Sequence, residues 1–187
     1  MNEQVVLANA QGLPCGTADK ATVHTTDTPL HFAFSCYLLD HQGRVLITRR
    51  ALGKKTWPGV WTNSFCGHPG VGEHPAQAVH RRGVQELGVP EGNLEKVEVI
   101  LPDFAYTAVD SSGIMENEIC PVYLARLAPG GKVQPAPAEV DSYHWLPPQQ
   151  LMAAVDAAPA VFSPWMVQQL SHPDLREALT RASTAAS

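Results

Sequence analysis

The stretch T-N-S-F-C-G-H-P-G-V-G-E-H, residues 62–74, places a thiol and an imidazole beside a glycine-rich turn. Cys66 and His68 are two residues apart, so their side chains point to the same side if the segment is extended. Glycine at this density predicts a tight turn or a backbone that lies close to a ligand. Because a thiol can transfer protons and an imidazole can bind a metal ion, this segment is a candidate catalytic loop.

A second candidate group combines acids with histidines. Glu116 and Glu118 alternate along a segment that we expect to be a strand, so both carboxylates face one side of a sheet. Two neighbouring negative charges are unfavourable unless a cation lies between them. His24, His31 and His68 could supply nitrogen ligands to that cation. Three imidazoles and two carboxylates suit Mn²⁺ or Zn²⁺, whereas Mg²⁺ prefers sites made only of oxygen.

These residues also have ordinary structural explanations. His24 and His31 lie in a threonine-rich segment and could be turn residues, and the two glutamates could form the polar face of an edge strand. A buried cysteine is commonly a small hydrophobic residue, which is our interpretation of Cys36 and Cys120. We expect the other histidines to be solvated at the surface: His41, His74, His80, His144 and His172.

Composition limits the classes of function. The 187 residues fit one domain, and the hydrophobic content of 44% argues against disorder. The net charge of −5 and the pI of about 5.9 make general nucleic-acid binding unfavourable. An anionic ligand would therefore need a local cluster of cations or a metal ion.

The chain carries no sign of a membrane or an oxidising compartment. Its first residues lack the features of a signal peptide, and no apolar run approaches the length of a membrane span. We therefore expect a soluble cytoplasmic protein, in which the four cysteines are free thiols. Nothing in the sequence indicates an obligate dimer, so we expect a monomer that binds a small molecule.

Hydrophobic patterning predicts the elements that must position these residues. We expect turns or loops over 10–31 and 129–138, and hairpin turns at D-H-Q-G and D-S-S-G. Pro75 and Gly88 suit the two ends of one helix, although Gly83 is unfavourable within it. The predicted strands cover 4–9, 31–40, 44–50, 96–107, 117–127 and 142–146, and the predicted helices cover 76–87, 148–157 and 164–181.

This order predicts one α/β domain of the α+β type over residues 1–181, followed by a disordered tail at 182–187. Strands joined by hairpin turns rather than by helices favour a mixed or antiparallel sheet.

The glycine-rich loop and the first helix resemble the Nudix box, whose glutamates hold divalent metal against a diphosphate. Gly67, Glu73, Arg81 and Glu86 have the spacing of that motif, which ends in Gly88-Val89. The motif has glutamates at two further positions, where this chain has Arg82 and Gln85. Hydrolysis of a diphosphate needs a cluster of metal ions, so these changes predict that the helix still binds a diphosphate but does not cleave it.

Three further stretches make the resemblance specific. T-N-S-F-C-G-H-P, E-N-E-I-C-P and F-S-P-W-M together resemble the type I isopentenyl-diphosphate isomerases, which have a Nudix-like mixed sheet sandwiched by helices. The similarity covers roughly residues 3–175 in the expected order. It implies an isomerase that interconverts isopentenyl and dimethylallyl diphosphate for isoprenoid biosynthesis.

The resemblance also implies roles for individual residues. Glu118, assisted by Tyr106, would protonate the alkene, Cys66 would remove the allylic proton, and Trp165 would stabilise the tertiary carbocation. We expect a nearby metal ion or cation to lower the pKa of Cys66. The diphosphate would be bound by Lys20, Arg50, Lys54 and Arg82, with Arg81 either close by or in a structural salt bridge.

Two metal sites are implied as well. The Mn²⁺ or Zn²⁺ site would consist of His24, His31, His68, Glu116 and Glu118. A Mg²⁺ ion, bound together with the diphosphate, would be held by Glu86 and by the backbone carbonyl of Cys66.

Other classes of protein fit the sequence less well. A Nudix hydrolase would need the missing carboxylates and would leave Cys66 without a purpose. A binding module that does not catalyse would need no acid–base pair, and a structural zinc protein would have paired cysteines at shorter spacings. For Trp165 a position in the core, at the start of a helix, is the alternative to a catalytic role.

Overall fold

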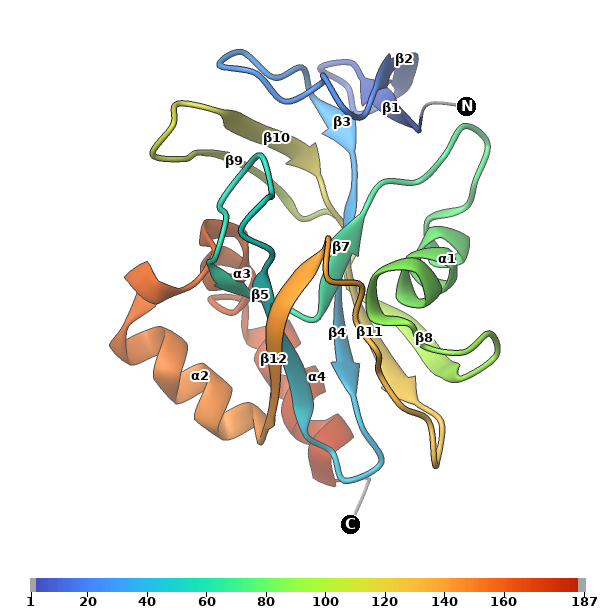
Figure 1. Ribbon diagram of the computed structural model, residues 1–187, viewed down its shortest axis with the longest axis vertical. Helices are drawn as coiled ribbons and strands as arrows, with labels where there is room; N and C mark the ends of the chain where they lie inside the picture. The colour runs from blue at the N-terminus through green and yellow to red at the C-terminus, as the bar shows by residue number, and fades with distance from the viewer. Residues whose placement is uncertain (1–2, 185–187) are drawn as a thin grey trace.

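Two β-sheets form the centre of the computed structural model, which describes residues 3–184 (Figure 1). The small sheet has the order β2-β1-β3-β10-β9. Its strands are β1 (Gln4–Ala8), β2 (Pro14–Asp19), β3 (His31–Phe32), β9 (Ala105–Val109) and β10 (Met115–Ile119).

The large sheet has the order β12-β5-β4-β11-β8, and the short strands β6 and β7 pair with β5 and β4. It is mixed, because β4 and β11 are parallel whereas the other pairs are antiparallel. Its strands are β4 (Phe34–Leu39), β5 (Val45–Arg50), β6 (Trp61–Thr62), β7 (Phe65–Gly67), β8 (Leu94–Leu101), β11 (Val122–Leu127) and β12 (Val140–Leu146).

Helices cover both faces of the large sheet (Figure 1). One face packs against α1 (Pro75–Leu87), and the other packs against α2 (Pro148–Ala157), α3 (Pro164–Gln169) and α4 (Pro173–Thr184). A short 3₁₀ helix, Pro159–Val161, lies between α2 and α3. The predicted α+β fold, a mixed sheet between helices, is therefore confirmed.

Strand β4 shows why the large sheet needs both helical layers. All six of its residues are buried, as expected of a central strand that is covered on two faces. Tyr37 and Leu39 belong to the core beneath α2–α4, whereas Cys36 and Leu38 belong to the core beneath α1. The alternation follows from the two-residue period of a strand.

Helix α1 begins and ends as its sequence predicts. Pro75 occupies its first turn, and Gly88 closes it in the left-handed conformation with φ of +60°. Gly83, which is unfavourable for a helix, lies where the helix meets β8, and a Cβ atom there would overlap the side chain of Leu94. The glycine therefore permits close packing between α1 and the sheet.

Three predicted strands are wrong in extent. The segment 31–40 forms β3 and β4, the segment 96–107 forms β8 and β9, and the segment 117–127 forms β10 and β11, with one strand of each pair in each sheet. The chain passes between the sheets near Pro102 and Pro121, where proline lacks the N–H that continues a ladder. The predicted D-S-S-G turn does join β9 to β10.

The predicted loop over 10–31 contains β2, an edge strand that is exposed from Pro14 to Thr17. The predicted helix 164–181 is two helices, because residues 170–172 interrupt it before Pro173. Helix α4 continues to Thr184, so residues 182–184 are not a disordered tail, and residues 185–187 lie outside the described part of the chain.

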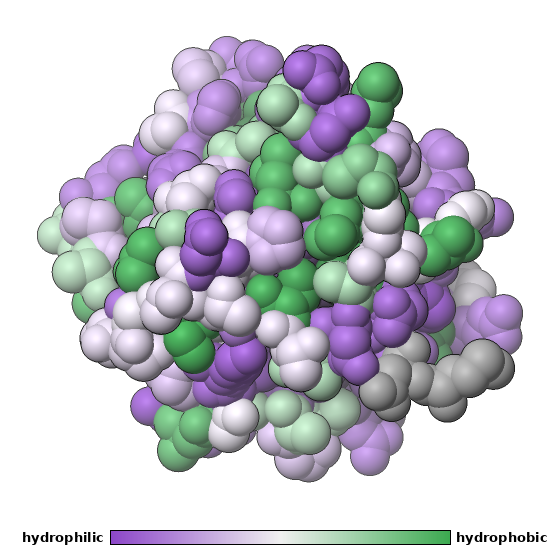
Figure 2. Space-filling view, turned by 90° about the horizontal axis from the view of Figure 1, so that it is seen from above, coloured by the Kyte–Doolittle hydropathy of each residue, from purple (hydrophilic) through white to green (hydrophobic). Residues whose placement is uncertain are grey.

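None of the described helices is both long and apolar enough to cross a membrane. At the end of the molecule that carries the small sheet, hydrophilic and hydrophobic residues are interspersed (Figure 2).

Candidate active site

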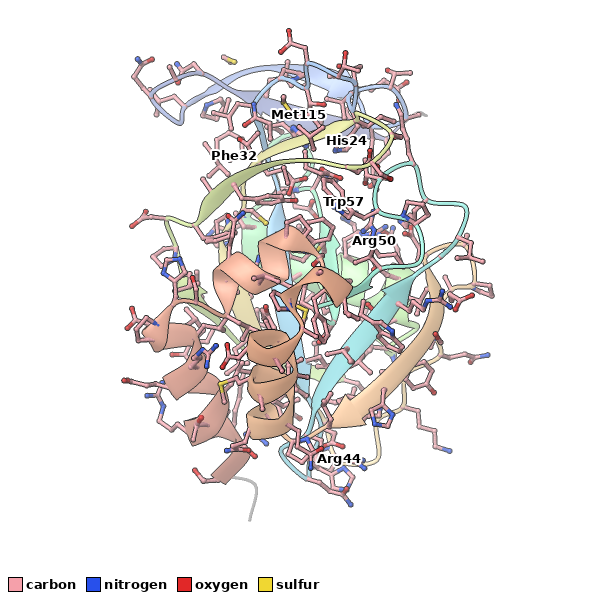
Figure 3. The ribbon with its side chains drawn as sticks, turned by 90° about the vertical axis from the view of Figure 1, so that its left-hand side faces the viewer. His24, Phe32, Arg44, Arg50, Trp57 and Met115 are labelled. Carbon is pink, nitrogen blue, oxygen red and sulfur yellow. The ribbon has the colours of Figure 1, made fainter. Side chains whose placement is uncertain are left out.

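A pocket of about 320 Å³ lies where the small sheet faces the loops of the large sheet. This volume is at the small end of the range for ligand sites, ~300–1,000 Å³. His24 lies just beneath the small sheet, with Trp57 and Arg50 below it (Figure 3). The predicted site residues that line the pocket are Lys20, His24, Arg50, Lys54, Cys66, His68, Arg82, Glu86, Tyr106, Glu116, Glu118 and Trp165.

The register of the small sheet places three side chains in a row. Glu118 on β10 pairs with His31 on β3 and with Tyr106 on β9. Directly paired residues lie side by side on one face of a sheet. Accordingly Glu118 Oε1 lies 3.4 Å from His31 Nε2, and the Tyr106 hydroxyl donates to Glu118 Oε2 at 3.0 Å. His31 is buried behind Glu118 and does not line the pocket.

The three histidines and Glu118 form a cluster with the geometry of a metal site. One ligand atom from each of His24, His31, His68 and Glu118 lies within 4.8 Å of the others. The Nδ1 atom of His31 lies 2.9 Å from the carbonyl oxygen of Pro29. Since Nδ1 must donate to that carbonyl, Nε2 of the neutral ring carries the lone pair and faces the cluster.

The donors of this cluster suit a metal ion. Within residues 3–184, His24 Nε2 and His31 Nε2 are buried without a hydrogen bond of good geometry, and each faces a carboxylate oxygen, of Glu116 at 2.9 Å and of Glu118 at 3.4 Å. Buried polar atoms normally have a well-formed partner, so imidazole nitrogens and carboxylate oxygens that converge in this way fit a bound cation. Three imidazoles with a carboxylate match Mn²⁺ or Zn²⁺.

Glu116 lies beside this cluster rather than within it. Its Oε2 is 2.9 Å from His24 Nε2, and its Oε1 accepts a hydrogen bond of 2.6 Å from the hydroxyl of Thr56. Both glutamates are buried on one face of β10, as their alternation predicts. The Arg50 guanidinium donates to the backbone oxygen of Thr56, so this threonine connects the acidic and basic parts of the pocket.

The charge of Glu118 is set by its neighbours. Burial alone would raise the pKa of Glu118, but its contacts with the imidazoles of His31 and His68 hold that pKa well below its usual value. Burial would lower the pKa of His31, yet its contact with Glu118 raises it overall, whereas burial lowers the pKa of His68. The protein's own groups therefore favour an ionised Glu118.

In the absence of a metal ion, the protein's own groups act against the predicted lowering of the Cys66 pKa. Burial raises the pKa of the Cys66 thiol to about 12, and the carboxylates of Glu86 and Glu118 add to the rise. Hydrogen bonds from Ser35 and Asn63 act in the opposite direction but are outweighed. The sequence predicted that cations lie close to Cys66. It did not predict that the thiol is shielded from solvent or that the carboxylates of Glu86 and Glu118 lie near it.

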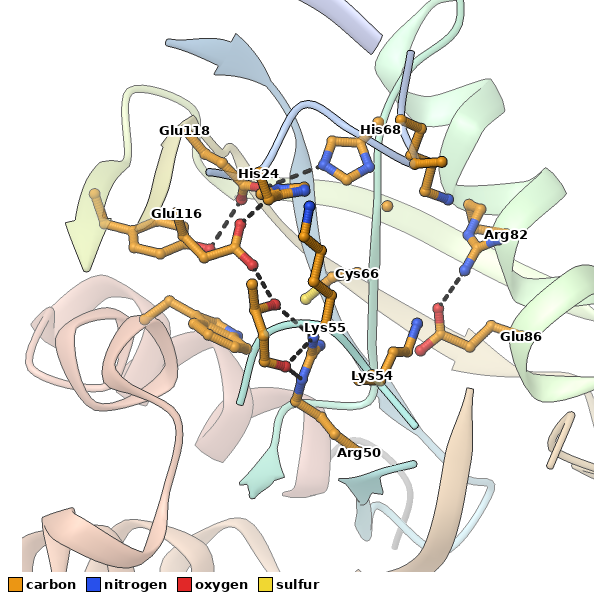
Figure 4. Close-up of a pocket in the computed structure, with 16 residues that line it drawn as sticks. His24, Arg50, Lys54, Lys55, Cys66, His68, Arg82, Glu86, Glu116 and Glu118 are labelled. Carbon is orange, nitrogen blue, oxygen red and sulfur yellow. Dashed lines mark hydrogen bonds and ion pairs between the residues drawn. The ribbon is translucent and has the colours of Figure 1, made fainter. Parts of the chain in front are cut away.

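Three basic residues of the pocket, Lys20, Lys54 and Arg82, are paired with carboxylates. Lys20 Nζ lies 3.0 Å from Glu3, and Lys54 forms an ion pair with Glu139. Arg82 is 2.7 Å from Glu86 and 3.2 Å from Glu139. In the view of Figure 4, Lys54, Arg82 and Glu86 lie on one side of the pocket, and His24, Glu116 and Glu118 lie on the other.

Arg81 and Arg82 differ in environment although they are adjacent. Arg81 donates to Glu73 at 2.8 Å and to the backbone oxygen of His68 at 3.0 Å, so it is the structural salt bridge that we considered. Arg82 is buried and lines the pocket, and its Nε makes no hydrogen bond to any residue that the structure describes. Helix α1 thus uses one arginine to fix the glycine-rich loop and the other at the pocket.

Trp165 is both a core residue and a wall of the pocket. Its side chain is buried, and its ring centroid lies 5.7 Å from that of Tyr106 and 5.4 Å from that of Trp57. The guanidinium carbon of Arg50 is 5.4 Å from the Trp165 ring, within the range of a cation–π contact. The ring can therefore interact with a cation in this environment.

Several residues of the site were missed from the sequence. Thr56 and Glu139 orient charged residues, whereas Ser35 and Asn63 contact the sulfur of Cys66 at 3.4 Å and 3.3 Å. The only signal for Asn63 and Thr56 is their position within the motif-rich segment 48–63. For Ser35 and Glu139 the contacts depend on tertiary packing, which no local pattern encodes.

Comparison with known proteins agrees with this site. The NUDIX domain model matches residues 29–166. A protein of Corynebacterium efficiens named isopentenyl-diphosphate Delta-isomerase is 61% identical over 180 residues, which cover 96% of this chain and 95% of that protein. This chain belongs to the isopentenyl-diphosphate Delta-isomerase family. A second member, from Kocuria rhizophila, is 54% identical over 95% of this chain and 96% of its own length.

Solved structures support the fold of this isomerase family member. A crystal structure of a Deinococcus radiodurans protein superposes with a TM-score of 0.64 at 20% identity, over 96% of this chain and 99% of that one. A Nudix hydrolase of M. smegmatis superposes with a TM-score of 0.58 at 18% identity, over 95% and 94% of the two chains. At these identities the likeness concerns the Nudix fold alone.

Proposed function

We propose that this protein interconverts isopentenyl diphosphate and dimethylallyl diphosphate, which supplies isoprenoid biosynthesis. The observation that carries the proposal is the convergence of the Cys66 thiol and the Glu118–Tyr106 pair on one pocket that also holds a group of cations. Moving a double bond requires one proton to be added at a carbon and another to be removed from a different carbon. A thiol and a carboxyl group can do both.

The basic side of the pocket would bind the diphosphate. Lys20, Arg50, Lys54 and Arg82 line it, and ammonium and guanidinium groups bind phosphate oxygens by charge-assisted hydrogen bonds. Their present carboxylate partners, such as Glu139 beside Lys54 and Arg82, hold these side chains towards the pocket. The hydrocarbon part of the substrate would then lie towards Cys66 and Trp165.

In the forward direction, the Glu118–Tyr106 pair would protonate the terminal CH₂ carbon of isopentenyl diphosphate. The π electrons form the new C–H bond, and a tertiary carbocation results. Cys66, as thiolate, would then remove a proton from the adjacent CH₂ group, and the electrons of that C–H bond form the new double bond. The substrate thus receives one proton from the Glu118–Tyr106 pair and gives up another proton to Cys66.

The raised pKa of Cys66 and the lowered pKa of Glu118 indicate which of the two groups holds a proton before the reaction starts. A thiol together with a carboxylate is the protonation state that suits the reverse direction, starting from dimethylallyl diphosphate. For the forward direction one proton has to move from Cys66 to the Glu118–Tyr106 pair. We infer that both protonation states are used, one for each direction.

Both metal ions would act through charge. When bound, Mn²⁺ or Zn²⁺ at His24, His31, His68 and Glu118, with Glu116 beside them, would adjust the acidity of Glu118, and Mg²⁺ would neutralise the diphosphate. We propose Glu86 and the backbone carbonyl of Cys66 as the protein ligands of Mg²⁺. Glu86 Oε2 also accepts from Arg82, so Arg82 and Mg²⁺ would share this carboxylate.

The carbocation has to be protected from water, which would trap it as an alcohol. At the apolar side of the pocket, the ring of Trp165 packs against the rings of Tyr106 and Trp57. The face of the Trp165 indole could stabilise the cation by up to ~2 kcal/mol in a desolvated site. The same packing explains why Trp165 is also part of the core.

Diphosphate hydrolysis is the activity that would contradict this proposal. Purified protein is incubated with isopentenyl diphosphate and Mg²⁺, and the products are separated by mass and by ³¹P NMR. We expect dimethylallyl diphosphate with the diphosphate intact, because Arg82 and Gln85 replace two glutamates of the hydrolytic motif. Release of phosphate without the isomer would mean that the protein is a hydrolase.

A further inference from the structure

Asn63 lies behind the pocket, in the turn between β6 and β7, with its side chain fully buried. Its amide nitrogen donates to the backbone oxygens of Phe65, at 2.8 Å, and Cys36, at 3.1 Å. Its amide oxygen accepts from the indole N–H of Trp165 at 3.0 Å and from the hydroxyl of Thr62 at 2.9 Å. Asn63 does not line the pocket and has no role in the proposed chemistry.

These partners fix the orientation of the amide. An indole N–H can only donate, so it must face the oxygen of Asn63, and backbone carbonyls can only accept, so they must face its nitrogen. A rotation of the amide by 180° would break the bonds to Trp165, Phe65 and Cys36 together. The Asn63 side chain therefore has one arrangement in the fold.

The sulfur of Cys66 lies against the edge of this amide. It is 3.3 Å from Nδ2 and 3.4 Å from Oδ1 of Asn63. A thiol can donate to the oxygen, and a sulfur without its proton can accept from the nitrogen. Asn63 can thus hold the sulfur in one position in both steps of the reaction.

Asn63 also connects two distant parts of the chain. It is separated from Trp165 by 102 residues. A second contact reinforces the connection, because the hydroxyl of Thr62 lies 2.8 Å from that of Ser163 at the start of α3. Strand β7, which carries Cys66, and helix α3, which carries Trp165, are therefore held together at the amide of Asn63.

We propose that Asn63 is a positioning residue, which fixes the sulfur of Cys66 and the indole of Trp165 relative to each other. The inference rests on the proposed function, because a defined separation between a proton acceptor and a cation stabiliser matters only if a carbocation forms between them. Asn63 acts through these two residues and touches no substrate.

The first test compares Asn63→Ala with Ser64→Ala in the metal-loaded enzyme. Ser64 is equally buried, and its hydroxyl bonds to Leu46 and Leu38, away from Cys66 and Trp165. We expect Asn63→Ala to lower kcat about 10- to 100-fold, because a small displacement of catalytic groups is costly. KM should stay within about threefold, because Asn63 lies outside the phosphate-binding cations. Ser64→Ala should keep wild-type kcat per folded molecule.

A double-mutant cycle distinguishes a positioning role of Asn63 from a general loss of structure. Trp165→Phe removes the indole N–H, so Asn63 has no indole to hold in that variant. The effect of Asn63→Ala on kcat should then be at least about threefold smaller than in the wild-type background. A folded Asn63→Ala with wild-type kcat, or effects of the two substitutions that simply multiply, would overturn the proposal.

A third measurement needs no isomerase activity and no folded Asn63 variant. In a Cys15→Ser background, which lacks the exposed thiol, the alkylation rate of Cys66 by iodoacetamide is compared with and without Trp165→Phe. Loss of the indole N–H removes one of the bonds that orient the amide of Asn63 and should change this rate at least about threefold. An unchanged rate would overturn the proposal, whereas a wild-type enzyme without isomerase activity would overturn only the proposed function.

Discussion

At the scale of the residue, Cys66 is the group whose environment differs most from expectation. The sequence placed it next to cations, and those cations do line the same pocket. Burial and two nearby carboxylates nevertheless raise the pKa of its thiol. Glu118, the other proton-transferring group, is buried among imidazoles, which hold its pKa well below the usual value. Two groups of the same pocket thus differ in protonation because their immediate neighbours differ.

The alkylation of Cys66 should show this raised pKa directly. The thiolate is the reactive form, so below the pKa the rate should rise about tenfold for each pH unit. With a pKa of about 12, the rate should still be rising between pH 8 and pH 10 in protein that has been freed of metal. The rate at Cys66 is measured by mass spectrometry of its peptide. A plateau near pH 8.5, where an unfolded chain would level off, would show that the site lowers the pKa after all.

At the scale of the element, Gly83 links the sequence of α1 to its packing. A helix former at this position would favour the isolated helix, yet Leu94 of β8 leaves no room for a side chain. Overpacking a tight contact typically costs ~1–3 kcal/mol of stability. This cost exceeds the stability that the higher helix propensity of alanine would add.

We therefore expect Gly83→Ala to lower the free energy of unfolding by about 1–3 kcal/mol, measured by urea denaturation. Gly53→Ala is the control, because no atom lies within 4 Å of a Cβ at that position and its φ is not positive. Equal stability of Gly83→Ala and wild type would mean that α1 and β8 pack less closely than described.

The elements also show what the sequence could and could not predict. The motif-bearing helix and the alternation of Glu116 and Glu118 were predicted correctly, because both depend on local spacing. The division of 96–107 into strands of two sheets was missed, since an apolar run does not show where its partner strand ends. The bond between Asn63 and Trp165 joins residues 102 positions apart, and no local pattern encodes such a contact.

At the scale of the whole molecule, the histidine–glutamate cluster joins the two sheets. His31 and Glu118 belong to strands of the small sheet, and His24 lies in the loop before β3, whereas His68 follows β7 of the large sheet. A metal ion held by all four residues would bind the folded chain and not the unfolded one. It would therefore stabilise the arrangement of the two sheets.

We expect Mn²⁺ or Zn²⁺ at about 100 times its dissociation constant to add ~2.7 kcal/mol of stability. For a chain of this size that corresponds to a rise in Tm of roughly 5–10 °C. His24→Ala should remove most of the rise, while His80→Ala, an exposed histidine on α1, should keep it. The measurement is a thermal melt with and without metal, and an equal rise in both variants would place the metal elsewhere.

The most direct test of the central claim is the isomerisation of isopentenyl diphosphate in D₂O, followed by NMR with Mg²⁺ and the metal-loaded enzyme. The wild type should form dimethylallyl diphosphate with deuterium in a methyl group, delivered by the Glu118–Tyr106 pair. Cys66→Ala and Glu118→Gln should each lower the rate by at least about 10³-fold, because each removes one of the two proton-transferring groups. Dimethylallyl diphosphate formed at wild-type rate by either folded variant would show that this pair does not carry the reaction.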